Sequence, residues 1–216
     1  MKLVLFTLAG AGAALAIGCS SLERSRDLGD PRVPAQTIAQ QVCSSCHGMT
    51  GNTVSPNFPN LAGQTKTYLT AQLKEFKSHS RQDPAGFEYM WGLTRSLTEA
   101  QIEGLADYYA HQRPEPQPVQ GPASRMDAGR QIFEKGIAAK NTPACTACHG
   151  EQGQGNEAFP RIAGQHLGYL VKQLTVFQLT NQRPDGAIMQ TVAHGLTRDD
   201  IDNVATYIQA LPSASR

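Results

Sequence analysis

Aromatic residues and an excess of either charge are both scarce in this chain of 216 residues. Phe, Trp and Tyr make up only 6% of it, which is little for two protein cores. Lys and Arg number 19 against 18 Asp and Glu, so the basic excess of a nucleic-acid-binding protein is missing. The apolar run Leu3–Ile17 is shorter than the roughly 20 residues that a transmembrane helix needs. Alternating strand-like patterns are rare as well, which favours helical structure.

Four of the five cysteines lie in two copies of the pentapeptide Cys-x-x-Cys-His, at 43–47 and 145–149, each followed by Gly. This pentapeptide is the attachment signature of a c-type haem. Both thiols can form thioethers to one porphyrin, and the His then lies under the iron. The sequence therefore predicts two covalently attached haem c groups. The residues assigned to them are Cys43, Cys46, His47, Cys145, Cys148 and His149. The buried porphyrins would supply the apolar mass that the aromatic content lacks.

A Cys-x-x-Cys pair has two other common uses, in a redox site and in a zinc site. A thioredoxin-like redox site needs a βαβ pattern, which is not found here. A zinc site needs four ligands in one cluster, whereas these two pairs lie far apart in the sequence. The His that directly follows each pair also favours haem.

The N-terminus indicates export to a bacterial periplasm. Residues 1–18 combine a positive Lys2 with an apolar run, as a signal peptide does. The sequence Ala-Ile-Gly-Cys at 16–19 resembles a lipobox, in which Cys19 becomes the lipid-bearing first residue of the mature protein. The alternative is ordinary cleavage after Ala16, which leaves Cys19 as a free thiol. Lipidation is favoured because it gives the unpaired cysteine a role, and it would anchor the protein to a membrane.

The chain is an internal duplication. Phe-Pro-Asn-Leu-Ala-Gly-Gln at 58–64 matches Phe-Pro-Arg-Ile-Ala-Gly-Gln at 159–165, in the same order relative to each pentapeptide. A Pro-rich stretch between the copies favours an extended spacer. The predicted organisation is a signal peptide at 1–18, a tether at 19–34, a first domain at 35–113, a Pro-rich linker at 114–124 and a second domain at 125–216.

Helical periodicity and capping signals recur in both copies. Apolar residues at 69, 73 and 76, and at 170, 174 and 177, fall on one helical face. Thr98 with Gln101, and Thr197 with Asp200, predict capping boxes that start the last helix of each copy. These helices are expected to end near His111 and before Pro212. The predicted fold class is all-α, with two tandem small helical domains, each wrapped around a covalent haem.

Met90 and Met189 are the only methionines at equivalent positions in the two copies, each seven residues before a Leu. A thioether opposite the proximal His raises the haem potential relative to a second imidazole, so these two methionines are predicted as sixth iron ligands beside His47 and His149. The alternative for each Met is core packing. Four histidines without a counterpart in the other copy could also take the sixth position: His79, His111, His166 and His194, the last being nearest to Met189.

Two further pairs have repeat-matched positions. The carbonyls of Pro59 and Pro160 are candidates to accept the hydrogen bond that fixes each proximal imidazole. Arg81 and Arg183 either pair with haem propionates or lie solvated at the surface.

Together these features resemble the cytochrome c4 family, over about residues 38–211. The resemblance rests on the two haem motifs, the Phe-Pro-x-(Leu/Ile)-Ala-Gly-Gln segments, the Tyr-Leu helices, and Met90 with Met189. It implies two cytochrome-c-like domains that face each other, with His/Met-ligated haems that pass single electrons. An insertion before Met90 and the lipobox at Cys19 depart from the family pattern.

The expected function is a non-enzymatic, periplasmic one-electron carrier. Its donor would be a respiratory dehydrogenase or cytochrome complex, and its acceptor a terminal oxidase or a similar protein. One alternative is the cytochrome subunit of a membrane-associated dehydrogenase complex. The other is a haem enzyme such as a peroxidase, which requires one iron to lose its Met ligand.

Overall fold

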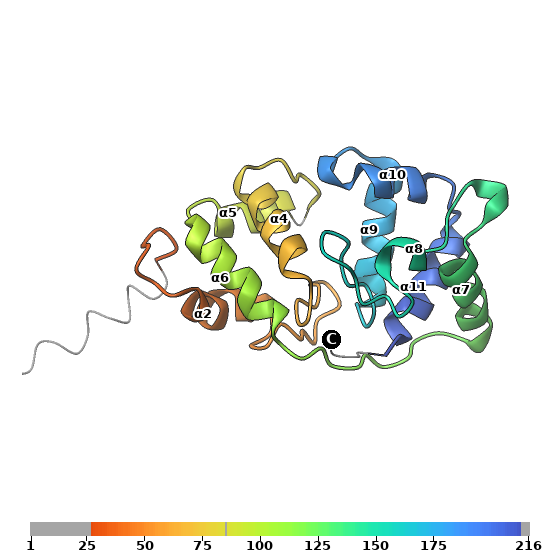
Figure 1. Cartoon of the computed structure of the whole chain (residues 1–216), viewed down its shortest axis with the longest axis horizontal. Helices are drawn as coiled ribbons and strands as arrows, with labels where there is room; N and C mark the ends of the chain where they lie inside the picture. Colours follow the sequence, from red (N-terminus) through yellow and green to blue (C-terminus); the bar gives the residue numbers. More distant parts are fainter. Residues whose placement is uncertain (1–26, 85, 213–216) are drawn as a thin grey trace, which may run out of the picture.

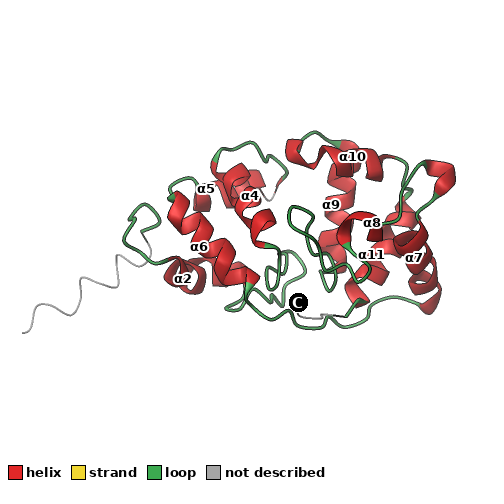
Figure 2. Ribbon diagram, viewed as in Figure 1, coloured by secondary structure: helices red, strands yellow, loops and turns green. Residues whose placement is uncertain are grey.

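The structure is a computed structural model that describes residues 27–84 and 86–212. Within these ranges the regular secondary structure is entirely helical, apart from two isolated bridges (Figure 2). The all-α prediction is therefore confirmed. Cys19, the leader and part of the tether lie outside the described ranges. Among the described helices, none has the length and apolarity that crossing a membrane requires.

The helices form two groups that lie side by side (Figure 1). The first group is α2 (Ala35–Ile38), η1 (Ala39–Cys43), α3 (Ser44–His47), α4 (Lys66–Lys77), η2 (Gly86–Met90), α5 (Trp91–Thr94) and α6 (Glu99–Ala110). The second group is α7 (Ala123–Lys135), η3 (Ala138–Lys140), α8 (Thr146–His149), α9 (Leu167–Leu179), η4 (Pro184–Gly186), α10 (Ala187–His194) and α11 (Arg198–Ala210).

The last helix of each half begins at a capping box, as predicted. The Thr98 hydroxyl accepts a hydrogen bond from the Gln101 N–H, and Gln101 Oε1 accepts one from the Thr98 N–H at 2.9 Å. Thr197 and Asp200 make the same reciprocal pair at the start of α11. Each box satisfies two backbone N–H groups that a helix start otherwise leaves unpaired. The two helices end beside His111 and Leu211, close to the expected positions.

Each half has its own apolar core. In the first half, α6 packs against α2 and α4, and Ile102 and Leu105 are almost fully buried. In the second half, α11 packs against α7 and α9 around the fully buried Phe133. Burying one such side chain stabilises a fold by about 1.5–3 kcal/mol. A Cβ on Gly129 of α7 would lie 2.1 Å from the Asn203 carbonyl oxygen, so the close contact of α7 with α11 requires glycine there.

The segment that joins the halves has no helix between α6 and α7, as its prolines predict. It runs along the lower edge of both groups in Figure 1. Asn52 of the first half holds it through the Arg113 carbonyl and the Glu115 N–H, each at 2.9 Å. Gln209 of the second half donates to the Pro118 carbonyl at 2.7 Å. The segment is therefore fixed to both halves along its length.

Candidate functional site

Each Cys-x-x-Cys-His segment forms one helical turn that places its functional side chains on one face. Cys43 ends η1, and Cys46 and His47 lie in α3. Side chains three and four positions apart share a face of a helix, so both thiols and the imidazole can contact one flat group. Cys145 caps α8, which contains Cys148 and His149 in the same arrangement.

Both imidazoles are buried and oriented by a proline carbonyl. His47 Nδ1 donates to the Pro59 carbonyl at 3.0 Å, and His149 Nδ1 donates to the Pro160 carbonyl at 2.9 Å. The predicted hydrogen bonds are thus confirmed. Because a carbonyl only accepts, Nδ1 carries the proton and Nε2 is the ring nitrogen suited to bind a metal. Burial lowers the pKa of both rings, which favours the neutral form that coordinates iron.

The four cysteines of the two motifs are available for attachment of a cofactor. None of the four in the described ranges forms a disulfide. Burial raises the pKa of Cys43 and of Cys145 to about 11, so both are protonated at neutral pH. Within 27–84 and 86–212 there is no group of three or more His, Cys, Asp and Glu that could hold a metal ion by itself. The zinc alternative therefore gains no support, and the geometry suits two thioethers to a porphyrin.

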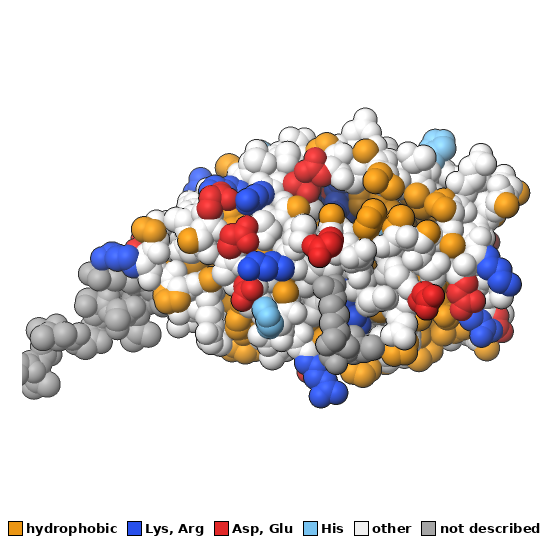
Figure 3. All heavy atoms as spheres, in the orientation of Figure 1, with side chains coloured by type: hydrophobic (Ala, Val, Ile, Leu, Met, Phe, Trp, Pro, Cys, Tyr) orange, Lys and Arg blue, Asp and Glu red, His pale blue; other side chains and the backbone are white. Residues whose placement is uncertain are grey.

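Met189 lies in α10 and packs against a small apolar cluster in the second half. That cluster comprises Phe177, Ala193, Leu196 and Ile201. Figure 3 shows apolar side chains gathered on the visible face around α9 and α10. Ile188, next to Met189, is 62% exposed there.

Met90 ends the π-helical turn η2, where the sequence carries its insertion. Gly86 and Gly186 are structurally matched, since each lies against the ring of a matched residue, Phe76 or Phe177. From those glycines the methionines follow after four and three residues, so η2 takes up one inserted residue. Single π-helical turns are the usual way to absorb one residue in a helix and are frequent at functional sites.

Three of the four histidines that could take the sixth iron position are hydrogen-bonded elsewhere or exposed at the surface. His166 Nε2 bonds the Thr53 carbonyl at 2.9 Å, the His111 side chain is 76% exposed beside Asp107, and His194 is exposed at the end of α10. His79 differs from them. Its ring stacks on Trp91 at 4.8 Å, next to Met90, and its buried Nε2 has no hydrogen-bond partner among the described residues. Of the four histidines, His79 is therefore the one that stays a candidate for the sixth position.

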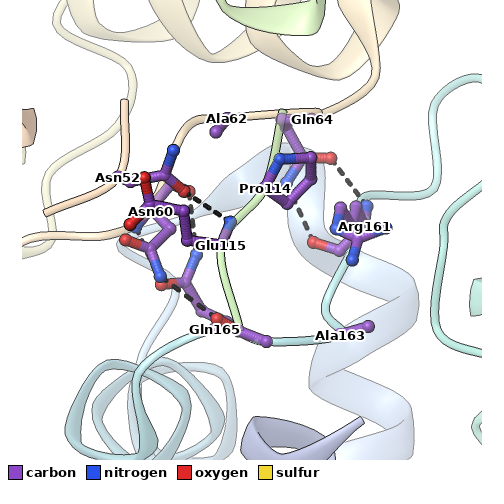
Figure 4. Close-up of a pocket in the computed structure, with 10 residues that line it drawn as sticks. Asn52, Asn60, Ala62, Gln64, Pro114, Glu115, Arg161, Ala163 and Gln165 are labelled. Atoms are coloured by element: carbon purple, nitrogen blue, oxygen red, sulfur yellow. Dashed lines mark hydrogen bonds between the residues drawn. The ribbon is translucent and has the colours of Figure 1, made fainter. Parts of the chain in front are cut away.

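The two glutamines of the repeated Ala-Gly-Gln segments join the halves. Gln64 Nε2 donates to the Arg161 carbonyl at 2.9 Å, and Gln165 Nε2 donates to the Asn60 carbonyl at 3.0 Å. Figure 4 shows these side chains around a small pocket between the halves. In the sequence these residues mark the repeat, but their role at the boundary is not predicted from it, because a repeat does not show that its copies touch each other.

A second contact between the halves is made of arginine and glutamine. Arg81 donates to Gln72 at 2.5 Å, while Arg183 donates to Gln173 at 2.6 Å and across to Gln72 at 2.8 Å. Both arginines are at most 5% exposed. The interpretation of Arg81 and Arg183 as solvated is therefore wrong, because the facing halves cover them.

Two buried hydrogen-bond donors in this cluster of arginine and glutamine side chains lack an acceptor among the described residues. Arg183 Nε and Gln173 Nε2 have no hydrogen-bond partner in the described part of the chain. A buried cation with an unused N–H is costly unless an acceptor reaches it. Haem propionates are carboxylates, so this donor set fits them, as one of the two sequence interpretations held.

Comparison with known proteins agrees with this geometry. The family model described as cytochrome c matches residues 33–112 and 126–212. Cytochrome c-552 of Acidithiobacillus ferridurans is 40% identical over 190 residues, which cover 88% of this chain and 82% of that protein. The crystal structure of reduced cytochrome c4 from Pseudomonas stutzeri has a TM-score of 0.74 and 35% identity, and the match covers 85% of this chain and all of that one.

A further relative is known by its redox partner. The thiosulfate dehydrogenase electron acceptor of Thiomonas intermedia is 32% identical over 174 residues, which cover 79% of this chain and 78% of that protein.

Proposed function

The chain belongs to the cytochrome c4 family of dihaem c-type cytochromes, and we propose that it passes single electrons from a respiratory donor to a terminal oxidase or similar acceptor in the bacterial periplasm. Its two cytochrome c domains each hold one covalent haem. The domain division proposed from the sequence is 35–113 and 125–216, with the linker between them.

The matched pair of His–Pro hydrogen bonds is the observation that carries the proposal. It presents Nε2 of His47 and of His149 to an iron in the same way in each half. The proposed attachment points are the two thiols of each motif, and the proposed sixth ligands are Met90 and Met189. Each bound haem supplies one-electron iron chemistry, and the protein supplies burial, ligand choice and orientation. With a histidine and a methionine from each domain holding the iron, no site would be left open for a substrate.

A redox titration followed by optical spectra tests this function. We expect two one-electron steps, and a methionine-to-iron charge-transfer band from both oxidised haems. If one band is missing and the resting protein binds cyanide rapidly, one iron is open and the peroxidase-like alternative replaces the carrier.

A second candidate is the electron-accepting subunit of a dehydrogenase complex. It is supported by the likeness to the thiosulfate dehydrogenase electron acceptor. The test is to mix the oxidised protein with a purified thiosulfate dehydrogenase and thiosulfate, and to follow haem reduction. Rapid reduction at a stoichiometric protein ratio would favour this candidate. If reduction is no faster than with an unrelated c-type cytochrome, the candidate is rejected.

Lipid attachment is a separate part of the proposal and rests on the Ala-Ile-Gly-Cys sequence at 16–19. Cys19→Ser should release the protein from the membrane fraction, while the unsubstituted protein stays there. Retention of the variant would show that the chain is held by something else.

A further inference from the structure

The peptide group between Pro59 and Asn60 is hydrogen-bonded on both sides, by two different halves of the molecule. Its carbonyl accepts from His47 Nδ1 at 3.0 Å. Its N–H, which belongs to Asn60, donates to Oε1 of Gln165 at 2.9 Å. One peptide group therefore links the proximal imidazole of the first domain to a side chain of the second.

The second domain has the mirror arrangement. The carbonyl of the Pro160–Arg161 peptide accepts from His149 Nδ1 at 2.9 Å, and its N–H donates to Gln64 Oε1 at 2.6 Å. Each glutamine thus reaches across the boundary to the peptide that orients the other domain's histidine. The connection between the domains is therefore made twice, once from each domain to the other.

Both glutamines are held firmly in this position. Gln64 and Gln165 are each 7% exposed. Each Oε1 also accepts the N–H of the next residue in its own chain segment, Thr65 at 2.9 Å and His166 at 3.0 Å. The Nε2 groups donate back across the boundary, to the carbonyls of residues 161 and 60. With every polar atom of the two carboxamides engaged, little rotation is open to them.

Hydrogen bonds in a chain polarise one another when they share a peptide group. An amide that donates through its N–H becomes a stronger acceptor at its carbonyl. A stronger acceptor at Nδ1 makes the imidazole a more basic metal ligand, which stabilises the oxidised iron.

We propose that Gln165 sets the potential of the first haem through the Pro59–Asn60 peptide and His47, and that Gln64 sets that of the second through the Pro160–Arg161 peptide and His149. Both glutamines are positioning residues, since neither contacts a haem ligand directly. This inference rests on the proposed axial roles of the two histidines. It makes the contact between the domains part of each haem's ligand environment.

The test compares Gln165→Leu and Gln64→Leu in the full-length, haem-loaded protein. Gln209→Leu is the matched control, because Gln209 is also buried and bridges two backbone groups, neither of which belongs to a peptide that accepts from His47 or His149. Each potential is measured in a titration that resolves the two haems by the NMR signals of their axial methionine methyl groups.

We expect Gln165→Leu to raise the potential of the first haem and leave that of the second in place, and Gln64→Leu to do the reverse. The amide exchange of Asn60 should become about tenfold faster in Gln165→Leu, the loss of one ordinary hydrogen bond. Gln209→Leu should change neither potential.

A shift confined to the haem of the substituted domain, equal shifts of both haems, or no shift would each overturn the proposal. If the leucine variants do not fold, Gln165→Asn and Gln64→Asn keep the polar group but cannot reach the far peptide, and the same crossed pattern is expected. The spectra of the unsubstituted protein decide the axial ligation separately, so failure of the proposed function would be recognised before any variant is compared.

Discussion

Arg81 donates from Nε to the Asp83 carboxylate over 2.6 Å, and the two side chains are 4% and 0% exposed. The pair closes the loop between α4 and η2 and holds it against the other half, where Arg81 also reaches Gln173 at 3.5 Å. An ion pair this deeply buried is stable only while both partners are present.

Asp83→Asn should therefore destabilise the protein by about 3–5 kcal/mol, because it leaves the Arg81 charge buried without its counterion. Asp127→Asn removes an exposed partner of Arg130 and should cost less than about 1 kcal/mol. Chemical denaturation of both variants measures the difference. Equal losses would show that the burial of the Arg81 pair does not matter.

Gly48 and Gly150 offer a matched test of backbone space. Both have φ in the left-handed region, at +76° and +83°. An added Cβ would lie 2.2 Å from the Asn52 carbonyl oxygen at Gly48, whereas its nearest neighbours at Gly150 would be atoms of the flexible Gln154 side chain. Gly150→Ala should cost about 1–3 kcal/mol, because its φ of +83° with ψ of 159° is a backbone region that essentially only glycine adopts, and Gly48→Ala should cost clearly more. Denaturation curves read through haem absorbance would refute this if the order were reversed.

Met189→Ala should open the second iron, abolish one methionine charge-transfer band and lower the potential of that haem. Met126→Ala is the control, because this methionine has no counterpart in the first half. Optical spectra and a redox titration give both readouts. An unchanged spectrum in Met189→Ala would disprove the assignment of this ligand.

Met90→Ala tests the ligand assignment in the first half, where the helical turn that ends at this methionine carries the inserted residue. The loss of the band with binding of cyanide would confirm Met90 as the ligand. His79, which stacks on Trp91, the residue after Met90, is the expected replacement ligand. In that case the iron stays six-coordinate at a lower potential, and His79→Leu added to Met90→Ala should restore cyanide binding. If the charge-transfer bands of both haems persist undiminished in Met90→Ala, the assignment of Met90 is contradicted.

His166 predicts a pH dependence of stability. Burial lowers its pKa, although its hydrogen bond to the Thr53 carbonyl acts in the opposite direction. The unfolded chain, in which the pKa is about 6.5, then binds more protons than the folded one. Stability is thus fully present above about pH 6.5 and falls as the pH drops from there, by at most about 1.4 kcal/mol per pH unit.

The comparison is with His166→Gln, whose free energy of unfolding should fall less between about pH 7 and pH 5. His111→Gln alters an exposed histidine and serves as the control. If the free energy of unfolding falls more steeply with decreasing pH in His166→Gln than in the unsubstituted protein, the predicted direction of the pH dependence is wrong.

The local features of each half follow from the sequence. The capping boxes at Thr98 and Thr197 and the carbonyls that orient His47 and His149 depend on residues near one another in the chain or on a fixed motif, so pattern alone finds them. Relations between the halves do not follow from it. Nothing in the sequence shows that Gln64 reaches Arg161, or that Arg81 and Arg183 are buried against each other's domain, because such pairs are fixed only when two finished domains pack.

Gln64 contacts Arg161, and Gln165 contacts Asn60, so equivalent residues of the two halves exchange contacts across the boundary. In a dimer with two-fold symmetry, a residue of each copy contacts the partner position of the other, and one sequence motif serves both sides. The Phe-Pro-x-(Leu/Ile)-Ala-Gly-Gln segment meets that condition with itself. The two halves therefore meet as the two subunits of a symmetric dimer do, although they belong to one chain, and the copies need not stay identical: where one has Thr65, the other has His166.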